Sequence, residues 1–230
     1  CFRQSALSVI QSVVDARNYL YEWVYNHHTV LYYSEMLRAA VRQLARHLAP
    51  ERPDCFWEAM FSEKPFAAPV PLDHGVEVYL PTDGDILHLL KRFRHDAAIA
   101  QVDEYLSHSP RRVALWKTCA EFRMLFKGSQ LLKADACRSA ARRLPELIVT
   151  KLGCKADDVM VIPALSKHYF IEEGDIRILM SSTGTLQPFT EVVGTRGNQE
   201  EATRFFYVFI APDYIGGRQD VIDLARGLTR

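Results

Sequence analysis

The feature that most restricts the fold is a change in the spacing of apolar residues about two thirds of the way along the chain. Up to about residue 147, apolar side chains recur at the three- and four-residue spacing of amphipathic helices. Beyond it they occur in short runs rich in branched and aromatic residues, which is typical of strands. These runs are 159–162, 176–180 and 205–210. The sequence therefore predicts a mainly α protein with a small C-terminal α+β lobe.

The helical part is predicted to contain several separate helices. The first covers about residues 4–48, with a kink or break near Asn26, His27 and His28, and ends at Pro50. Residues 50–82 are rich in proline and indicate an excursion or linker containing a short helix at 54–60. A further helix begins at an N-cap formed by Thr82 or Asp83. Helices are also predicted at 97–106, 131–147 and 220–228, the last closing on the sheet. We divide the chain into a helical body, residues 1–150 with the excursion at 50–82, and an α+β lobe, residues 151–230.

The first helix carries an unusual combination of side chains on one face. A regular helix would align Arg17, Tyr21, Val24, Tyr25 and His28 along one stripe. Arg17 and Tyr25 would lie roughly 12 Å apart along the helix axis, a span comparable to an extended nucleoside triphosphate. Arginine can grip a phosphate with two donors, and a tyrosine can pack against a sugar or base. In the alternative interpretation, Arg17 pairs with a buried acid and the aromatics are ordinary core residues.

The overall charge gives no sign of a polyanionic partner. Lys and Arg together number 28, as do Asp and Glu, so the net charge is zero. The stretch 111–151 is locally basic, with ten basic and three acidic residues. This stretch either faces phosphates or is a solvated surface. With Trp116, Phe122 and Phe126 interleaved, it also raises single-stranded nucleic-acid binding as a minor alternative, which the zero net charge disfavours.

Cysteine usage and hydropathy indicate a reducing cytoplasm. The five cysteines, at positions 1, 55, 119, 137 and 154, show no C-x-x-C spacing, so we expect buried thiols and neither disulfides nor a zinc site. No apolar stretch is long enough to span a bilayer, and no signal peptide is present. The sequence begins at Cys1 directly before a helical pattern, from which we expect a fragment of a longer protein.

Residues 15–28, DARNYLYEWVYNHH, resemble a signature helix of HD-domain phosphohydrolases of the dGTPase-like group, which release triphosphate from deoxynucleoside triphosphates. The resemblance continues weakly in 83–87 and in 111–117. It implies that the chain is the C-terminal portion of such an enzyme, a helical HD-type body without its metal-binding half. It also implies that Arg17, Tyr21 and Tyr25 bind the substrate, with Arg17 on the phosphate oxygens and Tyr25 at the sugar or base.

The same resemblance implies further partners. A divalent metal, Mg, Mn, Fe or Zn, would be held by residues upstream of Cys1, so this segment alone would be inactive. His27, His28 and Lys117 occupy positions near a regulatory nucleotide site of some relatives, with His28 standing where lysine is common. A homo-oligomer is expected as well. The alternative from another class is a non-catalytic regulatory or oligomerisation module that binds nucleotide without chemistry.

His95-Asp96 matches the dipeptide that gives the HD family its name. Its upstream flank is charged, whereas a metal-binding pair normally lies on a buried apolar helix. We interpret His95 as a residue near a helix C-terminus, where a cation favours the helix dipole. The sequence therefore predicts no metal site within this segment.

Overall fold

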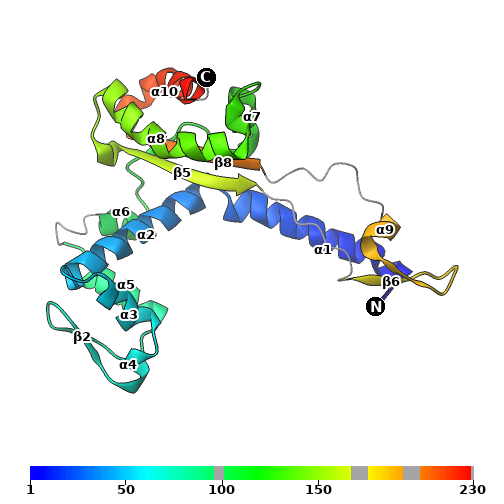
Figure 1. Ribbon diagram of the computed structural model, residues 1–230, viewed down its shortest axis with the longest axis horizontal. Coiled ribbons are helices and arrows are strands. Elements are labelled where there is room, and N and C mark those ends of the chain that lie inside the picture. The colour runs from blue at the N-terminus through cyan, green and yellow to red at the C-terminus, as the bar shows by residue number, and fades with distance from the viewer. Residues whose placement is uncertain (96–100, 167–175, 194–202, 229–230) are drawn as a thin grey trace. The chain divides into compact units, whose positions relative to one another are not determined.

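The structure is a computed structural model that describes residues 1–95, 101–166, 176–193 and 203–228 (Figure 1). It is mainly helical with small sheets, as predicted. The chain forms two compact units. The first contains residues 1–31 and 112–230, and the second contains residues 32–111. Helix α2, His28–Leu48, runs from the first unit into the second.

The first unit is built around a three-stranded antiparallel sheet of order β4-β8-β5. Strand β5, Val159–Ser166, pairs with β8, Thr203–Ile210, along its whole length. Helix α8, Ala134–Leu152, packs on these strands, and α10, Arg218–Gly227, packs against α8. The predicted closing helix is therefore confirmed, but it lies on α8 and not on the sheet. The remaining elements of this lobe are β4, Val113–Ala114; α7, Cys119–Leu125; and the 3₁₀ turns Gln130–Leu132, Ala156–Asp158 and Pro212–Gly217.

Aromatic side chains form the core of this lobe. Trp116, Phe122, Phe126 and Phe206 are completely buried. The indole of Trp116 lies 5.8 Å from the ring of Phe206, and its Nε1 donates a 2.6 Å hydrogen bond to the Phe206 carbonyl. This bond satisfies the polar atom that a buried tryptophan would otherwise leave unpaired.

A second small sheet lies beside the N-terminal helix. Helix α1, Leu7–Leu20, places Leu7, Ile10 and Val14 against a buried cluster formed by Ile178 and Phe189. The sheet has the order β1-β6-β7, and β1 pairs in parallel with β6. The predicted strand at 176–180 is confirmed, but it belongs to this sheet and not to the sheet of β5 and β8. The elements are β1, Phe2–Arg3; β6, Arg177–Leu179; β7, Leu186–Pro188; the 3₁₀ turn Gln4–Ala6; and α9, Phe189–Val193.

The second unit has its own apolar core, and its described elements are helices and one hairpin. Its core includes Ala40, Leu44 and Leu48 of α2 together with Phe56 and Leu90. Its other elements are α3, Asp54–Phe61; α4, Lys64–Ala67; β2, Val70–Leu72; β3, Val76–Val78; α5, Asp83–Arg92; and α6, Gln101–Ser107. The predicted helices at 54–60 and from Thr82 are confirmed, and the first residues of the helix predicted at 97–106 lie outside the described residues.

The Pro-rich segment 50–82 is folded into this second unit as α3, α4 and the β2–β3 hairpin. Residue 150, the end of the predicted helical body, falls inside α8. The division into a helical body, residues 1–150, and an α+β lobe, residues 151–230, is a prediction about domains. The compact units do not test it, so it stays a prediction.

The aromatic core predicts which substitutions will destabilise the fold. We expect Phe206→Ala to lower the free energy of unfolding by about 3–5 kcal/mol, because it leaves a cavity among fully buried rings. Met124→Ala, at a side chain that is 79% exposed, should change it by no more than about 0.5 kcal/mol. Urea unfolding of both variants measures this difference, and equal losses would contradict the core described here.

Candidate functional site

The predicted break in the first helix is present, and its geometry explains where the candidate residues lie. After α1 the chain forms a π-helical turn, Tyr21–Tyr25, closed by a 2.9 Å bond from the Asn26 amide to the Tyr21 carbonyl. The five-residue spacing of this bond is that of a π-helix, a local feature found often at functional sites. Helix α2 then begins at His28. The stripe predicted for a regular helix therefore ends before His28.

Asn26 fixes this break to the sheet. Its side-chain amide donates to the Leu165 carbonyl at 3.0 Å, and its own carbonyl accepts from the Tyr207 hydroxyl at 3.1 Å. Burial raises the pKa of Tyr207 well above its ordinary value of 10, so the phenol stays protonated and remains a donor. Strands β5 and β8 thus hold the point where the two helices separate.

Arg17, Tyr21 and Tyr25 form a ladder on the surface. The Arg17 guanidinium carbon lies 4.7 Å from the centre of the Tyr21 ring, and the Tyr21 and Tyr25 rings are 5.0 Å apart. Tyr21 is 40% exposed and Tyr25 is 55% exposed, so neither is a core residue. The structure therefore brings together the three residues predicted to bind substrate. A cation over an aromatic face is stabilised by the ring quadrupole, which restricts where the guanidinium can lie.

His28 lies beside His27, Tyr207 and Lys117. The His27 and His28 rings are 4.2 Å apart, and the His28 ring lies 6.1 Å from that of Tyr207. Burial lowers the pKa of His28, the charges of His27 and Lys117 lower it further, and a hydrogen bond to the Lys117 main chain opposes them. The buried Nδ1 of His28 has no hydrogen-bond partner in the described part of the chain. A proton there would add an unsatisfied donor, which also favours the neutral ring.

Lys117 is held by the start of α7. Its main-chain amide donates to Glu121 Oε2 at 2.9 Å, and Thr118 caps the helix by accepting from the Glu121 amide at 3.0 Å. Glu121 also accepts from Arg218 at 3.0 Å. The structure therefore places Lys117, which is distant in sequence, beside His28 and its neighbour His27, the other two residues predicted for a regulatory nucleotide.

Metal binding has no candidate in the described residues. No group of three or more His, Cys, Asp or Glu in the described ranges is arranged to hold an ion. Helix α5 ends at Arg92, so His95 follows a helix C-terminus as interpreted, while Asp96 lies outside the described residues.

All five cysteines lie in the described residues, and none of them forms a disulfide. Cys137 and Cys154 are buried as expected, Cys55 and Cys119 are half-buried, and Cys1 is exposed. Burial raises the pKa of the Cys137 thiol to about 11, so it stays neutral and is not a nucleophile at physiological pH.

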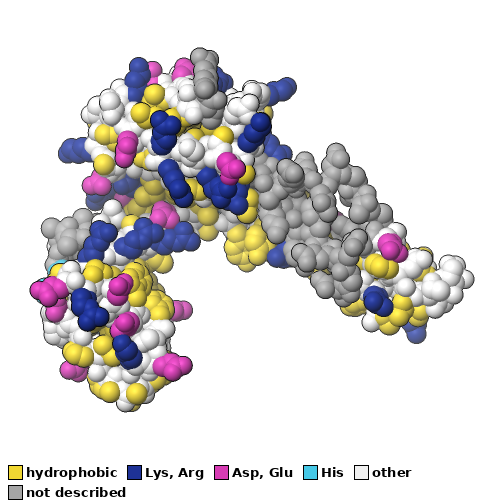
Figure 2. Space-filling view, viewed as in Figure 1, with side chains coloured by type: hydrophobic (Ala, Val, Ile, Leu, Met, Phe, Trp, Pro, Cys, Tyr) yellow, Lys and Arg dark blue, Asp and Glu magenta, His cyan; other side chains and the backbone are white. Residues whose placement is uncertain are grey.

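Two expectations about the stretch 111–151 are changed by the structure. Trp116, Phe122 and Phe126 are completely buried, so they cannot stack on bases and the nucleic-acid alternative loses its aromatic platform. Some of the basic residues bind internal partners. Arg112 donates to the Asp157 carbonyl at 2.7 Å, and Lys151 pairs with Asp220 at 3.7 Å. Figure 2 shows acidic side chains among the basic ones on this face of the lobe, which agrees with a solvated mixed surface.

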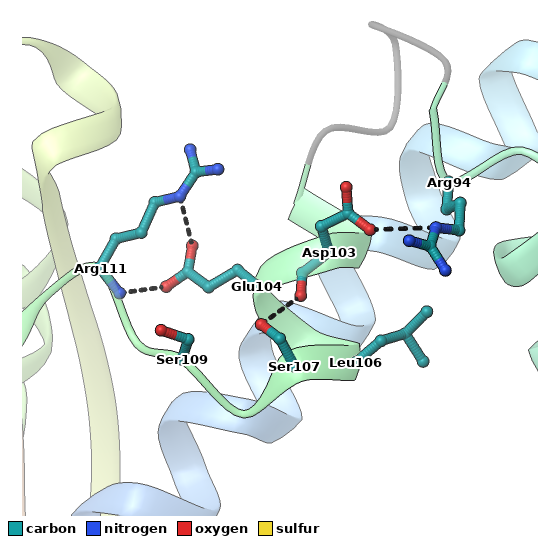
Figure 3. Close-up of a pocket in the computed structure, with 7 residues that line it drawn as sticks. All are labelled: Arg94, Asp103, Glu104, Leu106, Ser107, Ser109 and Arg111. Atoms are coloured by element: carbon teal, nitrogen blue, oxygen red, sulfur yellow. Dashed lines mark hydrogen bonds and ion pairs between the residues drawn. The ribbon is translucent and has the colours of Figure 1, made fainter.

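The second unit contains a cavity that sequence reasoning missed. It has a volume of about 480 Å³ (Figure 3). Glu104, only 3% exposed, accepts from the Tyr32 hydroxyl and from the Arg111 amide at 2.8 Å. The Arg111 side chain pairs with Glu104 at 3.9 Å, and Arg94 pairs with Asp103 at 3.4 Å. Each arginine charge is offset within the lining, so we interpret this cavity as structural. The lining is Arg94, Asp103, Glu104, Leu106, Ser107, Ser109 and Arg111.

The position of His28 predicts a pH dependence of stability. Because the folded pKa is below 6.5, the unfolded chain binds this proton first as the pH falls. The free energy of unfolding should be greatest above about pH 6.5 and fall as the pH approaches the folded pKa. We expect His28→Gln to weaken this dependence, measured by urea unfolding between about pH 7.5 and 5.5. His88→Gln, at an exposed position, serves as the control, because it leaves His28 intact and should keep the pH dependence of the free energy of unfolding. An unchanged pH dependence in His28→Gln would contradict its assignment to His28.

No helix in the described part of the chain is both long and apolar enough to cross a bilayer. No family model matches the chain, and no curated protein matches it. Among solved structures, it is similar to the 2.20 Å crystal structure of a phosphohydrolase from Bacteroides thetaiotaomicron VPI-5482, with a TM-score of 0.49 and 16% sequence identity. The match covers 91% of this chain and 51% of that one, so the chain spans about half the length of that protein.

Proposed function

We propose that this chain is the nucleotide-binding C-terminal portion of an HD-domain phosphohydrolase that converts deoxynucleoside triphosphates to deoxynucleosides and triphosphate. The resemblance of residues 15–28 to that family motivates the proposal. The observation that carries it is the surface ladder in which the Arg17 guanidinium lies over Tyr21 and Tyr21 lies beside Tyr25.

The ladder has the chemistry that a nucleotide requires. The guanidinium presents a planar fork of donors that matches phosphate oxygens, and its charge offsets the negative charge of a triphosphate leaving group. Tyr25 lies at the other end, where an exposed ring and hydroxyl can contact a sugar or base. No group of three or more candidate metal ligands lies together in the described residues. The role proposed for this segment is to bind and orient substrate, and we propose that the intact protein holds a divalent metal through residues upstream of Cys1.

Removal of the guanidinium should abolish turnover without unfolding the protein. In the intact protein we expect Arg17→Ala to lower kcat/KM for deoxynucleoside triphosphates by about 100- to 1,000-fold, because a preorganised donor at a developing charge is lost. Arg17→Lys keeps the positive charge but loses the planar fork of donors, so its kcat/KM should lie between those of the wild type and of Arg17→Ala. Assays with added Mg, Mn, Fe or Zn, followed by chromatography of deoxynucleoside and triphosphate, measure the effect.

Arg38→Ala is the matched control, because Arg38 is exposed on α2 and pairs with Glu35 at 3.0 Å. It should retain wild-type activity, and circular dichroism should show all variants folded. Near-normal activity of Arg17→Ala would overturn the proposal. Hydrolysis that yields a nucleoside monophosphate would overturn the proposed reaction while leaving nucleotide binding intact.

A second proposal concerns regulation, and the meeting of His27, His28 and Lys117 favours it. In the intact protein, which we expect to be a homo-oligomer, these residues would contact an activating nucleotide. Lys117→Ala should then raise the activator concentration needed for half-maximal activity by at least about ten-fold, because one charge-assisted contact to phosphate is lost. Lys127→Ala serves as the control. If the intact protein binds nucleotide but does not hydrolyse it with any of the added metals, the result would instead favour a non-catalytic nucleotide-binding module.

A further inference from the structure

A groove in the second unit lies between a strand edge and a helix. It has a volume of about 290 Å³. One wall is the run Gly75–Tyr79, which contains β3, and the other is one face of α5. Met60 of α3 contributes an apolar side chain to the lining. The helical residues that line the groove are Asp85, His88, Leu89 and Arg92.

The two walls match in length and run in opposite directions. Strand β3 has three residues, about 10 Å at 3.3–3.4 Å per residue. Asp85 to Arg92 on α5 covers about 10 Å at 1.5 Å per residue. Arg92 donates to the His74 carbonyl at 3.4 Å, which places the C-terminal end of α5 at the start of β3. The groove therefore has the length of about three extended residues.

The wall formed by β3 presents a free strand edge. The sheet has two strands, and within the described residues β3 pairs only with β2. An edge strand offers unpaired main-chain donors and acceptors to another extended chain. When such an edge lies beside a groove, an added strand gains main-chain bonds from the edge and specificity from the groove.

The groove is formed before any ligand arrives. Val76 and Val78 are buried, as is Leu89 of the facing helix. The turn that precedes β3 has positive φ at both central residues, His74 at 57° and Gly75 at 65°, the geometry that suits a tight hairpin. Thr82 and Asp85 form a capping box that fixes the start of α5. Rigid walls reduce the entropy lost when a ligand binds.

Charge gives the groove a direction. Arg92 is the cation at the end where β3 begins, and Asp85 is the anion at the end where β3 finishes. Hydrogen bonds from Thr82 keep the pKa of Asp85 low, so this carboxylate is ionised. A chain that runs antiparallel to β3 would place its C-terminal side at Arg92 and its N-terminal side at Asp85.

We propose that this groove binds an extended peptide segment of a partner protein, which adds as a strand antiparallel to β3. The segment carries a carboxylate at its C-terminal side, which contacts Arg92, and a basic residue about three positions earlier, which contacts Asp85. Small or branched apolar side chains between them pack on Met60 and Leu89. The proposal is independent of the phosphohydrolase function and of Arg17.

A selection from random heptapeptides with free carboxyl ends, followed by fluorescence anisotropy of labelled selected peptides, tests it on the intact protein. We expect enrichment of peptides with a basic residue before an apolar pair, and saturable binding. Arg92→Glu should weaken binding by at least about ten-fold. Lys91→Glu, an exposed cation of the same helix outside the groove lining, should change it by less than about two-fold.

Two modified peptides separate the elements of the proposal. N-methylation at alternate residues should abolish binding in one register and spare it in the other, because only every second amide of an added strand faces β3. If the carboxylate that contacts Arg92 is the terminal one, amidation of the carboxyl end should weaken binding. If that carboxylate is an acidic side chain near the end, amidation should have no effect, and replacement of the acidic residue by glutamine should weaken binding.

Several results would overturn the proposal. They are the absence of enriched peptides, equal effects of Arg92→Glu and Lys91→Glu, and N-methyl effects without alternation. A mass measurement that shows a dimer dissociated by Glu77→Pro, with no peptide binding, would also overturn it, because the edge would then be occupied by a second copy of the chain.

Discussion

The candidate site depends on the two hydrogen bonds made by Asn26. A helix that continued from α1 would carry its polar stripe past His28 along one face. Asn26 prevents this, because its side chain donates to β5 and its carbonyl accepts from Tyr207 on β8. The chain accommodates the change through a π-helical turn, and α2 starts afresh at His28. One residue, Asn26, therefore separates a surface ladder of Arg17, Tyr21 and Tyr25 from the half-buried His28 beside Lys117.

Periodicity predicted this region in outline but not in its details. It correctly placed a break near residues 26–28, since the pair of histidines and Asn26 interrupt the helical pattern. It could not predict a π-turn, because the extra residue is stabilised by contacts with Leu165 and Tyr207, which are far away in sequence. The contact from Arg17 to Tyr21 could be predicted from helical spacing, whereas Tyr21 and Tyr25 meet within the π-helical turn. The position of His28 depends on the sheet.

The same distinction applies to the rest of the fold. The strand runs at 159–162, 176–180 and 205–210 were identified from composition, but composition does not state which strands pair, and the middle run joined β1 near the N-terminus. Trp116, Phe122 and Phe126 looked like a stacking platform because basic residues separate them in sequence, yet the fold turns all three inwards. In the Pro-rich segment, Pro53 precedes α3, Pro65 lies in the first turn of α4 and Pro71 lies in a two-stranded hairpin. Each is a position that proline tolerates inside regular structure.

The two proposed binding surfaces share one physical device, an arginine whose guanidinium lies near an aromatic ring at the surface. Arg17 lies 4.7 Å from the centre of Tyr21, and Arg92 lies 5.2 Å from that of Phe93. Arg92 also donates to the His74 carbonyl, as Arg112 and Arg218 donate to main-chain carbonyls within the fold. The quadrupole of a ring attracts a guanidinium to its face and so helps to orient it. In a chain with zero net charge, the two proposals of anion binding therefore rest on how individual arginines are held, and not on an excess of basic residues.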